Sequence, residues 1–152
     1  MLRQYSYLLM KQNISTMNIQ KILLGTVVGG IVLTLAGFLI WGLGLESFIQ
    51  SHTASYDGLA KSEDAAFPFI IISCLATALL MSLVFNRWAN ISTAKTGASA
   101  GAVIAILVGL SADAMVLGQY NLIDSTVLLL NVIGNAVWGA VGGAAIGWLM
   151  GR

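Results

Sequence analysis

The chain has 152 residues, of which 58% are hydrophobic and 9% are charged, whereas about a quarter of the residues of a soluble domain are charged. This composition excludes a soluble globular protein. The chain carries seven Lys and Arg and six Asp and Glu, a net charge of +1, which leaves no basic field for nucleic acid as a partner.

The chain begins with a polar leader, residues 1–16, in which no hydrophobic periodicity is present. We expect this leader to be a short disordered arm or an incorrect start, because Met17 begins a stretch that has the look of a start in its own right. The remainder, residues 17–152, is predicted to be one transmembrane domain.

Four apolar runs follow the leader, and each is close to the roughly 20 residues needed to cross a hydrocarbon core of about 30 Å. A backbone in lipid must satisfy its own hydrogen bonds, and these runs are far longer than a membrane strand. The sequence therefore predicts an all-α, polytopic membrane protein, a four-transmembrane-helix bundle in the lipid bilayer. The predicted spans are 22–45, 67–85, 96–117 and 127–150.

The basic residues predict the orientation of the spans. Most of them lie at the two termini or between the second and third spans, and Lys61 is the exception. Because cytoplasmic loops are enriched in Lys and Arg, both termini are expected in the cytoplasm. The loop acids lie on the opposite side: Glu46, Asp57, Glu63, Asp64 and Asp124.

Glycines recur every four residues in the last span and, less regularly, in the third. Residues four apart share one helical face, and stripes of small residues let helices approach closely in lipid. Such a stripe either packs inside one bundle or forms the face of a homo-oligomer or a larger membrane complex. The second span has no comparable stripe, so we place it toward lipid. The helix-packing residues are Gly97, Gly101, Gly109, Gly139, Gly143 and Gly147.

Asp113 lies within the third span and is the first candidate for chemistry. A carboxylate in a span costs about 2.5–3.5 kcal/mol at the membrane centre and less near its edge, so it needs a partner, water or a proton. Antiparallel packing would bring Asp113 level with Asn131, which predicts a hydrogen bond between them with Asn135 nearby. The pair is either a proton- or cation-binding site or a polar clamp between two helices.

Glu46 and His52 follow the first span at the same outer level as Asp113. Together the three could bind a divalent metal or shuttle protons, but their spacing matches no metal signature. No metal site, catalytic residue set or cofactor is therefore expected. Trp138 lies near the bilayer centre between Gly134 and Gly142, where it either walls a pocket or fills space beside the glycines.

The region from Met17 to Arg152 resembles small four-span bacterial inner-membrane proteins of families of unknown function. The residues that carry the resemblance are Leu110-Ser111-Ala112-Asp113 and the glycine-rich segment 139–148. The resemblance implies a bacterial inner membrane and no particular activity.

Three functions are compatible with these patterns. We favour a structural or accessory subunit that packs through glycine-rich helix faces, because packing signals outnumber chemical ones. The alternative is a small dimeric transporter or channel for protons, cations or a small solute that uses Asp113 with Asn131 and Asn135. The third is a membrane enzyme that uses Glu46, His52 and Asp113.

Overall fold

The protein is helical, and four of its helical segments are long and apolar enough to cross a membrane. The computed structural model describes residues 18–152, so the predicted leader lies outside the described residues. The predicted fold class, an all-α polytopic four-helix bundle, is confirmed. Its elements are α2 (Ile19–Gly37), the π-helical η1 (Phe38–Gly44), α3 (Glu46–Ser51), α4 (Glu63–Leu83), the π-helical η2 (Val84–Trp88), α5 (Ala94–Gln119) and α6 (Ser125–Met150).

The membrane-length segments begin two or three residues before the predicted starts, because polar caps and not the apolar runs set the helix starts. Asp124, for example, accepts hydrogen bonds from the backbone N–H groups of Thr126 and Val127, both at 2.9 Å. Such a cap satisfies N–H groups that have no partner inside the helix. Side chains cap three of the four segments: Asn18, Thr93 and Asp124.

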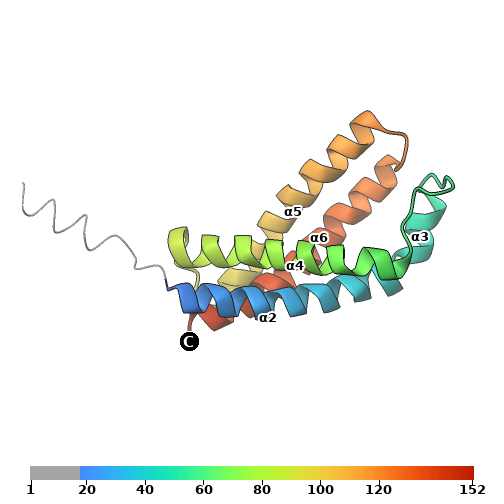
Figure 1. Cartoon of the computed structure of the whole chain (residues 1–152). Coiled ribbons are helices and arrows are strands. Elements are labelled where there is room, and N and C mark those ends of the chain that lie inside the picture. Colours follow the sequence, from blue (N-terminus) through green and yellow to red (C-terminus); the bar gives the residue numbers. More distant parts are fainter. Residues whose placement is uncertain (1–17) are drawn as a thin grey trace, which may run out of the picture.

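The four long helices form two hairpins that meet at one end and diverge toward the other (Figure 1). The first hairpin joins α2 to α4 and the second joins α5 to α6. Helix α2 packs on both α4 and α6, whereas α5 packs almost entirely on α6. The bundle is therefore wedge-shaped.

Backbone contact between α5 and α6 holds the second hairpin together. A Cβ atom added at Gly97 would overlap the carbonyl oxygen of Gly143, and one at Gly101 would overlap that of Gly139. A Cβ at Gly147 would lie 2.9 Å from the Cα of Gly97. Any side chain at these positions would force the helices apart, so the glycine rows of the third and fourth spans face each other within the chain.

The end at which the hairpins meet is closed by packing and by hydrogen bonds. Phe85, Met81 and Ile146 are fully buried there. The Lys21 ammonium donates to the carbonyl oxygen of Met150 at 2.7 Å. These contacts join the start of α2, the end of α4 and the end of α6.

The third span is more exposed than the second, which the sequence places toward lipid. In the third span, α5, 11% of the most apolar stretch is buried, against 22% in the second span, α4. The physical reason is that α5 packs its small residues on α6 and makes little contact with the other helices. Helix α4 instead buries larger side chains, Cys74, Ala78 and Met81, against the rest of the bundle.

Substitution of Gly101 tests the contact between α5 and α6. We expect Gly101→Ala to lower the free energy of unfolding by about 1–3 kcal/mol, because the added methyl group overlaps the backbone of α6. The measurement is unfolding of the purified protein by SDS titration in mixed micelles.

Gly118, on the same helix, is the matched control because a Cβ added there meets nothing within 4 Å. Gly118→Ala should leave stability unchanged or raise it slightly, since alanine favours a helix over glycine. Equal losses of unfolding free energy in the two variants would contradict the backbone contact between α5 and α6.

Candidate functional site

A cavity of about 980 Å³ lies between α2 with η1, α4 and α6, where the hairpins diverge. No residue of α5 belongs to the wall that the structure describes. The wall is mainly apolar and rich in rings, a composition typical of small-molecule sites. Its aromatic residues are Phe38, Trp41, Phe67, Phe69 and Trp138. We call this cavity the crevice.

Two tryptophans from different helices form the inner part of the crevice. The indole Nε1 of Trp138 donates to the carbonyl oxygen of Leu33 at 2.7 Å, which ties α6 to α2. The two indole rings of Trp41 and Trp138 meet edge to face, with centroids 5.9 Å apart and planes at 75°. A buried indole N–H needs an acceptor, so this bond fixes the ring of Trp138 in the wall.

The π-helical segment η1 presents Phe38 and Trp41 to the crevice. A π-helix has a wider turn than an α-helix and is frequent at functional sites. Space for the Trp41 ring comes from Gly134, where an added Cβ would lie 3.2 Å from the ring. Gly134, four residues before Trp138 in the sequence, therefore accommodates the other tryptophan.

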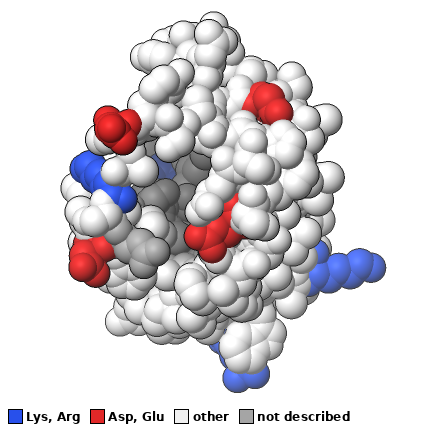
Figure 2. All heavy atoms as spheres, turned by 90° about the vertical axis from the view of Figure 1, so that its right-hand side faces the viewer, with Lys and Arg blue, Asp and Glu red and all other residues white. Residues whose placement is uncertain are grey.

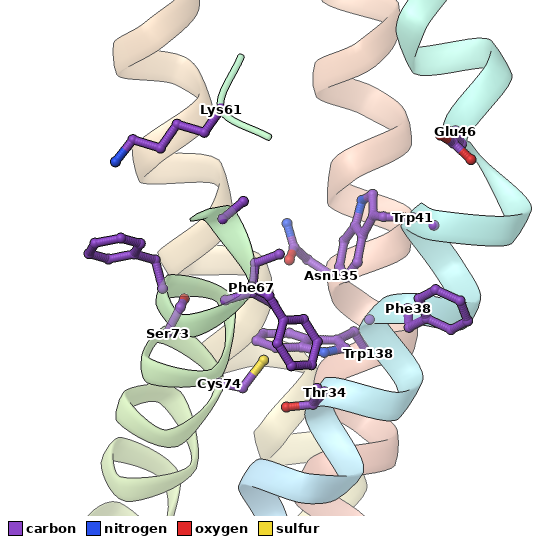
Figure 3. Close-up of a pocket in the computed structure, with 15 residues that line it drawn as sticks. Thr34, Phe38, Trp41, Glu46, Lys61, Phe67, Ser73, Cys74, Asn135 and Trp138 are labelled. Atoms are coloured by element: carbon purple, nitrogen blue, oxygen red, sulfur yellow. The ribbon is translucent and has the colours of Figure 1, made fainter. Parts of the chain in front are cut away.

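Besides Glu46 at the rim, Asn135 is the predicted site residue that lies in the crevice wall. Its side chain is half-buried and packs against Gly109, where an added Cβ would lie 2.7 Å from the amide carbon. In the part of the chain that the structure describes, its amide has no hydrogen-bond partner. Figure 3 shows it close to Trp41 and above Trp138.

Asn131 and Asp113 do not form the predicted hydrogen bond. Asn131 Oδ1 accepts from the indole Nε1 of Trp41 at 3.1 Å instead. Asp113 is half-buried on α5, outside the crevice wall. Its carboxylate has no hydrogen bond or ion pair to any residue in the range 18–152. Asn131, the partner expected for Asp113, is therefore bonded to Trp41 of η1.

Glu46 and His52 lie at the two ends of the short helix α3, and each contacts a residue of that helix. Glu46 is at the crevice rim and accepts from Gln50 Nε2 at 3.1 Å. His52 stacks on Phe48 with ring centroids 4.1 Å apart. Among the described residues, no group of three or more His, Cys, Asp or Glu could hold a metal ion, so the structure does not assemble Glu46, His52 and Asp113 into such a group.

The wide end of the bundle carries acidic side chains around a hollow, as Figure 2 shows. A short segment after α3 crosses to the second hairpin at this end. The backbone N–H of Ala54 donates to the carbonyl oxygen of Leu122 at 2.8 Å, and Thr53 forms an isolated antiparallel bridge with Ile123. These contacts link the tips of the two hairpins beside the opening.

The sequence is compatible with both roles of Trp138, and the structure places it in the crevice wall. No pattern in the sequence connects Trp41 or Phe67 with Trp138. The glycines that flank Trp138, Gly134 and Gly142, are the available sequence signal for this packing, because a glycine leaves room for a neighbouring side chain. No sequence pattern indicates that the side chain beside Gly134 is an indole ring from the first span.

No protein-family model, no curated protein and no solved structure matches this chain. The resemblance to small four-span bacterial inner-membrane proteins therefore stays a prediction.

Double-mutant cycles on unfolding free energy distinguish the two possible partners of Asn131. We expect a coupling of about 0.5–1.5 kcal/mol between Trp41→Phe and Asn131→Ala, because each removes one side of the same hydrogen bond. The measurement is SDS unfolding of the two single variants, the double variant and the wild type.

The matched cycle combines Asp113→Asn with Asn131→Ala. It should show no coupling, and Asp113→Asn alone should not lower stability, because Asp113 has no partner in the described chain. Strong coupling in this second cycle with none in the first would restore the polar clamp predicted from the sequence.

Proposed function

We propose that this integral membrane protein binds a small solute in the crevice and acts as a small carrier that is open toward its acidic end. This is the transporter hypothesis with its site moved from Asp113 to the wall formed by Trp41, Asn135 and Trp138. The observation that carries the proposal is a cavity of about 980 Å³ that opens at one end of the bundle while the other end is closed.

A carrier needs a site near the middle of the membrane that is reached from one side at a time. The crevice has this form. Trp138 lies near the middle of α6, and Glu46 and Lys61 lie at the rim. Beyond Trp138, Leu33 and Ile146 are fully buried and pack the closed end.

The charges support an orientation in which the crevice opens away from the cytoplasm. The closed end carries Lys21, Arg87, Lys95 and Arg152, and the open end carries most of the acids. Cytoplasmic loops are enriched in Lys and Arg. We therefore place the closed end in the cytoplasm and, following the resemblance, the protein in a bacterial inner membrane.

The accessory-subunit hypothesis depended on glycine faces that a partner could use. Helices α5 and α6 cover the glycine rows of the third and fourth spans with each other. Gly25 and Gly29 of the first span face Ser82 and Ile146. These faces are used within the chain, so they support no partner. A homo-oligomer stays a prediction.

Cys74 gives a direct test of the crevice, because it is the only cysteine of the chain and its side chain, although only 5% exposed, borders the crevice. We expect a membrane-impermeant methanethiosulfonate reagent to modify Cys74 when it is added on the acidic side of proteoliposomes. Addition on the basic side should modify it at least about tenfold more slowly, because the packed closed end blocks that path.

The control is a second position on α4, about 12 Å further toward the closed end at 1.5 Å per residue. In the variant Cys74→Ser/Ser82→Cys, the new thiol replaces a fully buried side chain and should react from the acidic side at least about tenfold more slowly than Cys74 does. Equal rates at the two positions would overturn the proposal.

A second pair of variants tests whether the crevice itself is the path. Ser73→Phe places a ring in the wall and should slow modification of Cys74. Ile72→Phe places the same ring on an exposed side chain outside the wall and should not. Slowing by both variants would indicate a general disturbance of α4.

A further inference from the structure

Among the described residues, none with a charged side chain lines the interior of the crevice. Glu46 and Lys61 are the charged residues that the structure places in the wall, and both are exposed at the rim (Figure 3). Glu46 is engaged by Gln50, and the Lys61 ammonium lies 4.7 Å from the centroid of the Phe69 ring. Removing an ion from water is costly unless it is paired, so this interior favours an uncharged ligand.

The ring-lined part of the wall favours a flat apolar body. Aromatic rings prefer edge-to-face or offset contacts with other rings. The Trp138 ring is fixed by its bond to Leu33 and offers its remaining surface to the crevice, and Phe67 lies near it in Figure 3. The volume of about 980 Å³ is at the upper end of the range for sites of drug-sized ligands.

The polar groups of the wall differ in how far their hydrogen bonds are already satisfied. The Thr34 hydroxyl already donates to the carbonyl oxygen of Gly30 at 2.8 Å. Ser73 is exposed and can be solvated. Asn135 is half-buried beside the tryptophans, and its amide has no partner in the described part of the chain. An amide that loses water without gaining a partner is destabilising, so a ligand group that pairs with Asn135 would be favoured.

We infer that the crevice takes an uncharged, ring-bearing molecule with one hydroxyl group, which pairs with the Asn135 amide while the ring lies against Trp138. The inference rests on the proposed function and names the class of its solute. The Asn135 Nδ2 packs closest against Gly109 of α5, whereas Oδ1 lies farther from that glycine. Oδ1 can accept a hydrogen bond from a ligand hydroxyl.

The test compares two probes of nearly equal shape, 2-naphthol and 2-methylnaphthalene, which differ in whether a hydroxyl or a methyl group is present. Each is titrated against the full chain in one detergent, and the half-protecting concentration is read from the slowing of Cys74 modification. The ratio of the two concentrations measures the preference for the hydroxyl. Partition of the probes into micelles is the same for every variant, so it cancels when these ratios are compared.

We expect Asn135→Leu to reduce this preference by about fivefold to tenfold, the loss of one hydrogen bond, with protection by 2-methylnaphthalene retained. Asn135→Ala, which removes the amide without adding bulk, should give the same result if the leucine variant does not fold. Thr34→Val is the matched control and should leave the ratio unchanged, because that hydroxyl is already bonded within its helix.

The outcomes separate the inference from the function on which it rests. Protection of Cys74 by both probes with an unchanged ratio in the Asn135 variants would overturn the role of Asn135 and keep the crevice as a solute site. Loss of preference in Ser73→Ala in place of the Asn135 variants would also overturn it. Protection by neither probe would overturn the proposed function itself.

Discussion

Close approach of helix backbones at glycines sets the geometry on which the rest of the bundle depends. In lipid no hydrophobic force drives helices together, so dispersion between closely packed surfaces must hold them. Helix α6 meets this need with glycines in its second half, where Gly143 touches α5 and Gly142 receives Leu33 of α2. Toward the open end the same helix carries Asn135 and Trp138. The larger side chains keep the hairpins apart, so the change in residue size along α6 accounts for the wedge.

The apolar runs and charges in the sequence were sufficient to predict the four spans, because each run must cover the hydrocarbon core. Antiparallel packing of consecutive spans also predicted the relative level of α5 and α6. Gly101 lies against Gly139, and Gly109 against Asn135. One further step of four places Asp113 across from Asn131, as the sequence implied. The register followed from local rules because both partners are consecutive helices.

The candidate site could not be predicted in the same way. The hydrogen bond of Asn131 goes to Trp41, which lies 90 residues away in the chain. Whether Trp41 reaches it depends on the packing of α2 on α6 and on the π-helical turn of η1, and neither has a periodic signature in the sequence. The unpaired state of Asp113 follows from the same contact. A carboxylate near the edge of a span can remain accessible to water, and the structure gives it no partner in the described chain.

The closed end contains a feature that bears on how such a carrier would work. Ser82 is fully buried, and its hydroxyl has no hydrogen-bond partner among the residues described. It lies against Gly25, where an added Cβ would be 2.7 Å from its oxygen. An unpaired buried hydroxyl costs about 1–3 kcal/mol, and separation of α2 from α4 would let water reach it. The unpaired hydroxyl raises the free energy of the closed arrangement only. It therefore brings that arrangement closer in free energy to one in which this end is open. A carrier whose site is reached from one side at a time needs these two arrangements to be close in free energy.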